Sequence, residues 1–214
     1  MVYLSYSKGC DNGNGATTAV ARGRLDRAGH ALRGVEDVIV FDACTRRGQH
    51  FGSRLVFDDE GYLFVTVGDR GEMDQAQNTA NHQGTLNRLE DDGTIPPDNP
   101  FVGRRGYRPS IWAYGIRSPQ GLALHPETRE LWETEHGPQG GDELNLVERG
   151  NNYGWPVITY GVNYGRERRP IGAGITKAPG LEQPVHYWDP SIATSSLMIY
   201  GGDAFPEWKG DAFV

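Results

Sequence analysis

Apolar and polar positions along the chain repeat a unit of two short strands joined by an acidic turn. The stretch RLVFDDEGYLFVTVGD (54–69) has an apolar strand, a turn and a second strand in which apolar and polar residues alternate. The stretch GLALHPETRELWETEHG (121–137) repeats this order with different residues. Because successive side chains of a strand point to opposite faces, this period of two predicts strands with one buried face.

The spacing of this unit predicts a β-propeller. Second strands of the unit begin near Val2, Tyr62, Glu130 and Asp211, so the repeat is about 60 to 80 residues long. That length suits one blade, a sheet of about four strands with its loops. No stretch shows an apolar helical stripe over three turns. We therefore predict an all-β propeller of about three to four blades. A β-sandwich is the alternative, which the long loops rich in glycine and proline disfavour.

Both ends of the chain lie inside strands of this repeat. The first residues, VYLSYS, resemble a second strand, and the last, GDAFV, stop within another one. We therefore expect residues 1–214 to be one partial propeller domain from a longer protein, with a ring that does not close within this chain.

Composition and charge narrow the range of partners. Thirty glycines and thirteen prolines favour many turns between short strands. The net charge is −7 and basic residues do not cluster, so no nucleic-acid partner is expected. No run of about 18 apolar residues and no signal peptide is present, so membrane insertion is not expected. Cys10 and Cys44 are either free thiols or at most one bridge.

The stretch TEHGPQGGDELNLVERGNNYGW (134–155) places acidic residues directly after glycines that follow a strand. A hard cation such as Ca²⁺ prefers oxygen ligands, and tight turns expose backbone carbonyls. Gly137 and Pro138 offer such carbonyls, and Glu143 and Tyr153 offer further oxygens nearby. The alternative is a tight loop with a surface acid pair, because no EF-hand spacing is present.

Three strings resemble the soluble pyrroloquinoline-quinone (PQQ) dependent sugar dehydrogenases, the glucose/sorbosone or aldose sugar dehydrogenase family. They are HGPQGGDELNLVERGNNYGWP, GIRSPQGLALHP and NHQGTLNRLEDDGTIPPDNPF, and the likeness extends from about His50 to the C-terminus. This resemblance implies a six-bladed propeller, a periplasmic location, and PQQ with Ca²⁺ over the central channel. The small-molecule substrate would be an aldose sugar.

The resemblance also implies roles for individual residues. The carbonyls of Gly137 and Pro138 would hold the Ca²⁺ that contacts PQQ. Glu143 and Tyr153 would form a structural Ca²⁺ site.

A histidine suits the role of base because its ordinary pKa lies near neutrality. The resemblance assigns this role to His82, with Asp98 as the carboxylate that orients it. His50 is the reserve candidate, and Asp98 has an alternative interpretation as part of a proline-rich turn.

Cofactor contacts would come from Arg117 and Ser118, which follow Ile116 in the string GIRSPQG. The family pattern here is commonly His-Arg-Asn-Pro, so Ser118 replaces an asparagine and should weaken PQQ binding. Other PQQ contacts of the family come from regions outside this chain, so we expect the 214 residues alone to be impaired.

The predicted function is oxidation of aldose sugars at C1 to the lactone, with hydride transfer to PQQ and electrons passed to an external acceptor. The alternative is a non-catalytic Ca²⁺-binding propeller module or scaffold. A lactonase-like propeller is a third possibility, but its metal would be held by several acidic or amide side chains from different blades.

Overall fold

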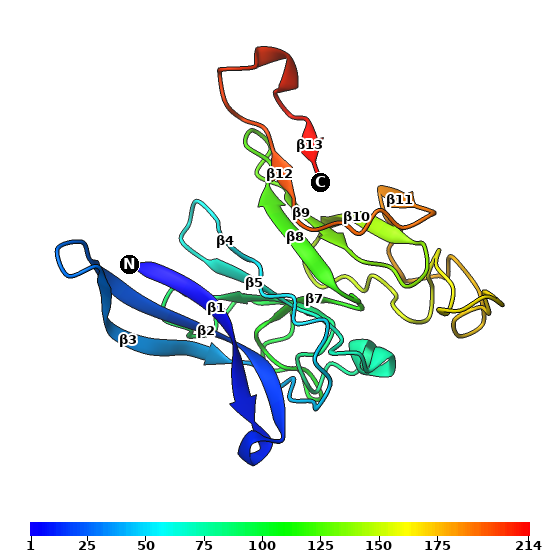
Figure 1. Ribbon diagram of the computed structural model, residues 1–214, viewed down its shortest axis with the longest axis horizontal. Coiled ribbons are helices and arrows are strands. Elements are labelled where there is room, and N and C mark those ends of the chain that lie inside the picture. The colour runs from blue at the N-terminus through cyan, green and yellow to red at the C-terminus, as the bar shows by residue number, and fades with distance from the viewer.

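The computed structural model describes all 214 residues, and its regular structure is almost entirely antiparallel strand (Figure 1). The first sheet contains β1 (Val2–Cys10), β2 (Gly15–Asp26) and β3 (Ala31–Val40). The second contains β4 (Leu55–Phe57), β5 (Leu63–Val67), β6 (Thr85–Leu89) and β7 (Ile111–Tyr114). The third contains β8 (Pro119–Leu124), β9 (Leu131–Glu135), β10 (Asp142–Val147) and β11 (His186–Trp188). A short pair, β12 (Met198–Ile199) with β13 (Ala212–Phe213), follows.

Each sheet is a meander in which strands pair with their neighbours in sequence, as the blades of a propeller do. Figure 1 shows the sheets following one another in chain order without closing into a ring. The predicted second strands correspond to β1, β5, β9 and β13. The prediction of an all-β, unclosed propeller is therefore confirmed. That residues 1–214 form a single domain of a longer protein stays a prediction.

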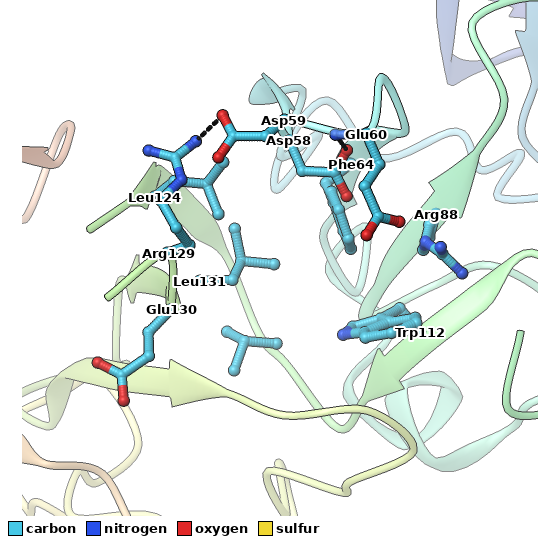
Figure 2. Close-up of a pocket in the computed structure, with 11 residues that line it drawn as sticks. Asp58, Asp59, Glu60, Phe64, Arg88, Trp112, Leu124, Arg129, Glu130 and Leu131 are labelled. Atoms are coloured by element: carbon cyan, nitrogen blue, oxygen red, sulfur yellow. Dashed lines mark hydrogen bonds and ion pairs between the residues drawn. The ribbon is translucent and has the colours of Figure 1, made fainter. Parts of the chain in front are cut away.

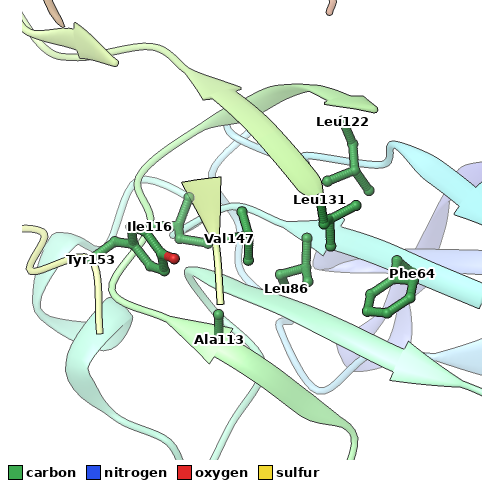
Figure 3. Packing of buried hydrophobic residues seen from close by; sticks show 8 residues of the cluster. All are labelled: Phe64, Leu86, Ala113, Ile116, Leu122, Leu131, Val147 and Tyr153. Carbon is green, nitrogen blue, oxygen red and sulfur yellow. The ribbon is translucent and has the colours of Figure 1, made fainter. Parts of the chain in front are cut away.

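The apolar core lies between neighbouring sheets. One cluster, which includes Phe64, Leu86, Leu131 and Val147, joins the second sheet to the third (Figure 3). Another cluster joins the first sheet to the second.

Strand β5 is buried on both faces, so the expectation of a single buried face was wrong for this strand. All five of its residues are buried. Leu63, Val65 and Val67 point to the cluster shared with the first sheet, and Phe64 points to the cluster shared with the third. The alternation in the sequence is real, but it divides side chains between two cores because sheets pack against both faces of this blade.

Cys10 and Cys44 form a disulfide, which resolves the two alternatives left by the sequence. It joins the end of β1 to the loop that follows β3. Backbone hydrogen bonds between Ala16 and Thr45 support the same junction. The loop that runs on to residue 50 is therefore tied to the first sheet.

The helices are three short 3-10 segments, η1 (Asp11–Gly13), η2 (Met73–Gln77) and η3 (Pro206–Trp208). None of them has the length and apolar character that a membrane span requires.

Candidate active site

Five loops meet at one pocket of about 190 Å³. Asp69 follows β5, Arg117 follows β7, and Pro138 follows β9, so all three lie at the same end of the strands. His50 comes from the loop that precedes β4, and Trp155 comes from the long loop after β10. Arg47, Asn163 and Tyr164 are among the other residues that line this pocket.

His50 and Asp69 form the central pair of the pocket. Nδ1 of His50 lies 2.6 Å from Oδ1 of Asp69, and the Asp69 side chain is 2% exposed. A carboxylate can only accept hydrogen bonds, so the imidazole carries its proton on Nδ1 and leaves Nε2 as an acceptor. A positioned imidazole with a free Nε2 can take a proton from a hydroxyl group.

The Asp69 carboxylate is held by two further donors. The Trp155 indole Nε1 donates to Oδ2 at 2.8 Å, and the backbone N–H of Gly71 donates to Oδ1 at 2.7 Å. With both oxygens bonded, the carboxylate has one orientation, and that orientation fixes the His50 ring.

Glycine allows the two loops to approach each other. A Cβ on Gly68 would overlap the backbone carbonyl of His50 and would come within 3.0 Å of the Arg117 carbonyl oxygen. The backbone N–H of Asp69 donates to that same Arg117 carbonyl at 2.8 Å. His50 itself has a φ of 53°, a left-handed conformation that non-glycine residues seldom adopt.

Arg117 is buried against the pocket wall. Its Nη1 donates to the His136 carbonyl at 2.8 Å, and its guanidinium lies 5.3 Å from the Trp155 ring centre. The backbone N–H groups of Arg117 and Ser118 both donate to Oε2 of Glu135. Arg117 therefore lines the pocket, and its predicted contact with a cofactor stays a prediction. Ser118 is buried and does not line this pocket, and its hydroxyl accepts from Gln120 at 3.2 Å.

His82 lies outside the pocket, and both of its ring nitrogens are engaged. The backbone N–H of Asp42 donates to Nδ1 at 2.9 Å, so Nε2 carries the proton and donates to Ser110 Oγ at 2.9 Å. Burial, and then the charge of Arg108, lower the pKa of His82 to about 4. A histidine with no free nitrogen cannot take a proton from a substrate, so the geometry disfavours the role that the sequence suggested.

Asp98 is likewise separate from His50. Its side chain is 64% exposed and pairs with Arg88 at 2.9 Å. That ion pair holds the pKa of Asp98 below its ordinary value. The carboxylate that contacts His50 is instead Asp69, which the sequence analysis did not single out. A signal was available, because the string VGDRG ends β5 in the same blade position as EHGP at the end of β9.

The loop after β9 presents the carbonyls that the sequence suggested as metal ligands. No hydrogen bond reaches the carbonyl oxygen of Gly137 or of Pro138. A side-chain hydrogen bond stabilises the turn, because the Gly137 N–H donates to Oδ1 of Asp142 at 2.9 Å. A Cβ on Gly137 would overlap the backbone of Gly141, so this turn requires glycine.

Behind that loop, three glutamates share one face of β9 and β10. Glu143 is the cross-strand partner of Glu135, and Asn145 is the partner of Glu133. Burial is the main cause that raises the pKa of Glu135 to about 7 and the pKa values of Glu133 and Glu143 well above their ordinary range. Oε1 of Glu133 and Oδ1 of Asn145 have no hydrogen-bond partner.

Tyr153, the predicted partner of Glu143 in a metal site, lies close to it, but the Tyr153 hydroxyl is hydrogen-bonded to other groups. Glu143 and Tyr153 line one small cavity together with Glu135 and Gly137. The Tyr153 hydroxyl donates to the Leu146 carbonyl at 2.6 Å and accepts from the Glu148 N–H. Only the main-chain oxygen of Tyr153 is left to bind a cation. No group of three or more His, Cys, Asp or Glu side chains is arranged to hold a metal ion.

The four-stranded meander sheets identify the chain as part of a propeller protein. Its candidate site, with His50 and Asp69, lies in the loops at one end of the strands. The family model for glucose/sorbosone dehydrogenase matches residues 1–214. Aldose sugar dehydrogenase YliI of Escherichia coli strain K12 is 45% identical over 213 residues, covering 100% of this chain and 57% of that protein. The chain belongs to the glucose/sorbosone dehydrogenase family, which confirms the resemblance noted in the sequence.

Solved structures agree with this assignment. The apo-form of the soluble aldose sugar dehydrogenase of Escherichia coli has a TM-score of 0.89 and 44% identity, covering 97% of this chain and 59% of that one. The PQQ-bound aldose sugar dehydrogenase of Streptomyces coelicolor has a TM-score of 0.71 and 26% identity, covering 91% and 51%. The chain thus spans between 51% and 59% of the length of these relatives.

Proposed function

We propose that this chain carries the base and part of the cofactor site of an enzyme that oxidises aldose sugars at C1 to lactones. The enzyme would use PQQ and Ca²⁺ and would pass electrons to an external acceptor. The His50–Asp69 pair, 2.6 Å apart in a pocket that also holds Arg117 and Pro138, carries this proposal. The names of the relatives, which include a PQQ-bound aldose sugar dehydrogenase, support it.

His50, rather than His82, is the proposed base. Its Nε2 would accept the proton of the C1 hydroxyl group, and Asp69 would stabilise the imidazolium that forms. Trp155 and the Gly71 N–H would keep Asp69 in place through this step. PQQ, when bound, would supply the electron-pair acceptor for the hydride that leaves C1.

The residues of the pocket fit an anionic, flat cofactor. PQQ carries three carboxylates, and Arg47 and Arg117 provide two guanidinium groups on the pocket wall. The Trp155 ring adds an aromatic surface. Two arginines cannot pair with three carboxylates, so we also propose that residues 1–214 alone turn over slowly.

Main-chain oxygens fit the Ca²⁺ that would accompany PQQ. The carbonyls of Gly137 and Pro138 accept no hydrogen bond and belong to a turn that glycine makes possible. A second Ca²⁺ would bind Glu143 and the Tyr153 carbonyl. The unpartnered oxygens of Glu133 and Asn145 nearby support a cation there.

A periplasmic location is part of the proposal. The Cys10–Cys44 disulfide supports it, because such bridges persist in oxidising compartments and are rare in the cytosol.

The decisive experiment compares two histidine variants of the natural full-length protein. With PQQ, Ca²⁺ and an aldose, dye reduction should fall by about three orders of magnitude or more in His50→Gln. His82→Gln should keep most of its rate after correction for folded protein. EDTA should remove activity, and added Ca²⁺ should restore it.

Three results would contradict the proposal. They are no sugar-dependent rate in the parent protein, full activity in His50→Gln, or loss of activity in His82→Gln alone. If Ca²⁺ raises the melting temperature while PQQ adds nothing, the non-catalytic Ca²⁺-binding module is the better description.

A further inference from the structure

The backbone around His50 has little support of its own. No backbone–backbone hydrogen bond involves any of residues 46–52, on either side of the proposed base. The segment is also strained, because His50 has a φ of 53° and Ser53 has a φ of 78°, a left-handed conformation that non-glycine residues seldom adopt. Strain of this kind persists only where the surrounding structure fixes the segment. Other groups must therefore hold the loop that carries His50.

The guanidinium of Arg70 supplies hydrogen bonds that this backbone lacks. Its Nη1 donates to the Gln49 carbonyl, and its Nη2 donates to the Arg47 carbonyl at 3.0 Å. No backbone N–H reaches either carbonyl. Nη2 also donates to the Ala16 carbonyl at 3.3 Å, near the start of β2. One side chain thus joins the loop before His50 to the first sheet.

The same guanidinium lies over the ring of the residue that follows His50. Its carbon Cζ is 3.3 Å from the centre of the Phe51 ring. The Phe51 carbonyl accepts a hydrogen bond from the Thr18 hydroxyl at 2.7 Å, so this residue is also bonded to β2. Arg70 therefore contacts the loop on both sides of His50, while Asp69, its neighbour in sequence, holds the His50 ring.

Arg70 is a buried charge with no carboxylate bonded to it. The residue is 0% exposed, its hydrogen bonds all go to main-chain carbonyls, and its Nε has no partner. Burial lowers the pKa of Arg70 to about 10, and the charges of Asp69 and Glu72 act in the opposite direction. The group therefore stays protonated near neutral pH. Because burial of an unpaired charge is unfavourable, the stability of the fold alone does not account for this arginine.

We propose that Arg70 is a positioning residue for His50: its guanidinium fixes the backbone on both sides of this residue, and Asp69 fixes the ring. The inference rests on the proposed function for the role of His50 as the base. A planar guanidinium can donate in several directions and cover an aromatic ring at the same time, which the ammonium group of lysine cannot do. Without these contacts the loop would lose the geometry that keeps Nδ1 of His50 against Asp69 and Nε2 free.

The tautomer of His50 tests this inference without sugar, PQQ or Ca²⁺. The natural full-length protein is labelled with ¹⁵N-histidine, and two-bond ¹H–¹⁵N spectra are recorded above the ordinary pKa of histidine. The His50→Gln variant identifies the signals of His50. The parent protein should show a single form with the proton on Nδ1, because Nδ1 is bonded to Asp69. Arg70→Lys, which keeps the charge but not the fork of donors, should show a mixture of the two tautomers.

The kinetic counterpart uses the same variant with PQQ, Ca²⁺ and an aldose. After correction for folded protein, the kcat of Arg70→Lys should fall by about tenfold to a hundredfold, because a small displacement of a catalytic group slows a reaction strongly. KM should change by less than about threefold, because Arg70 does not line the pocket.

Arg88→Lys is the matched control. Arg88 is also a buried guanidinium over an aromatic ring, since its side chain is 6% exposed and its Cζ is 3.7 Å from the centre of the Tyr62 ring. It pairs with Phe64 near the start of β5, and it lines a cavity between the second and third sheets, away from the His50 pocket (Figure 2). Arg88→Lys should lower the melting temperature, as Arg70→Lys does, and should leave the His50 tautomer and kcat unchanged.

An unchanged tautomer in a folded Arg70→Lys protein would overturn the inference, whatever its rate. Equal effects of Arg70→Lys and Arg88→Lys on the tautomer would also overturn it, because both arginines would then act only on general stability. If Arg70→Lys does not fold, Phe51→Leu decides the question, since it removes the ring and leaves the hydrogen bonds of Arg70 in place. It should give a smaller shift toward the mixture of tautomers, and no shift would overturn the inference.

The failure of the proposed function would look different. A mixture of tautomers in Arg70→Lys, with an unaltered rate or with no sugar-dependent rate in the parent protein, would support the role of Arg70. The same result would contradict the role of His50 as the base.

Discussion

The indole Nε1 of Trp155 donates a 2.8 Å hydrogen bond to Oδ2 of Asp69, which lies 86 positions earlier in the chain. Through Asp69 this contact fixes the ring of His50, so Trp155 controls the geometry of the proposed base from outside the His50–Asp69 pair. Under the proposed function, Trp155 is a positioning residue.

Trp155→Phe should remove this hydrogen bond and destabilise the fold by about 1.5 to 3 kcal/mol, because the acceptor is a carboxylate. The kcat of sugar oxidation should fall by about tenfold or more, with a smaller change in KM. Denaturant unfolding and steady-state kinetics measure the two effects. Trp132→Phe is the matched control, since the buried Trp132 indole nitrogen has no hydrogen-bond partner to lose. Equal destabilisation by both variants would contradict the interpretation.

His82 should make stability depend on pH on the acid side. Its pKa is lowered from 6.5 to about 4 in the folded protein, so folding favours the neutral ring. This contribution is complete above about pH 6.5 and is lost as the pH falls from 6.5 toward 4, with a full size on the order of 3 kcal/mol. The difference in unfolding free energy between the parent protein and a variant without this imidazole should therefore shift against the parent as the pH falls from 7 to 4, whatever the buried glutamates contribute to both.

The control for this prediction is His82→Gln, whose amide can donate and accept but does not titrate. Relative to that of the parent protein, its unfolding free energy should rise as the pH falls over this range. Identical pH dependence for the variant and the parent protein would show that His82 makes no such contribution.

Gly68→Ala should disturb the contact between the loops of His50 and Asp69. The added Cβ would overlap the His50 carbonyl, and the backbone must shift to make room. We expect a loss of about 1 to 3 kcal/mol in stability together with a strong loss of activity.

Gly48→Ala is the control, because it lies two residues before His50 and its Cβ would meet nothing within 4 Å. Its effect on stability should stay within about 0.5 kcal/mol. Thermal unfolding and initial rates of both variants check this pair. A harmless Gly68→Ala would mean that the close approach is not needed.

Removal of the disulfide should loosen the loop that leads to His50. The bridge closes a loop of 34 residues, so its loss should cost about 3 to 4 kcal/mol in the chain-entropy description. Dithiothreitol should lower both the melting temperature and kcat. The double variant Cys10→Ser/Cys44→Ser should show the same losses and should not respond to dithiothreitol. If dithiothreitol still lowered the melting temperature or kcat of the double variant, its effect would have a cause other than reduction of this disulfide.

Much of the fold could be predicted from the sequence because each blade repeats the same local pattern. The strand pairs around Asp58 and His125 were visible as alternating apolar residues on either side of an acidic turn. The burial of both faces of β5 could not be seen there, because it depends on neighbouring sheets and not on the strand itself.

The site was harder to predict, because its members come from distant loops. Arg117, Gly137 and Pro138 could be named from local strings, and all three lie at the same end of their blades. The choice between His50 and His82 could not be made locally, since both occupy loops near glycines. Only the three-dimensional structure reveals that Asp69 is hydrogen-bonded to His50 and that Ser110 Oγ is hydrogen-bonded to Nε2 of His82.

The position of β5 has a practical meaning for anyone who wishes to engineer the protein. Leu63, Val65 and Phe64 pack in two interfaces, and β5 ends at Val67, two residues before Asp69, so a library that varies these side chains would shift the His50–Asp69 pair along with the core. Strand β3, where six of the ten residues are exposed, is the safer place to introduce tags, labels or stabilising changes.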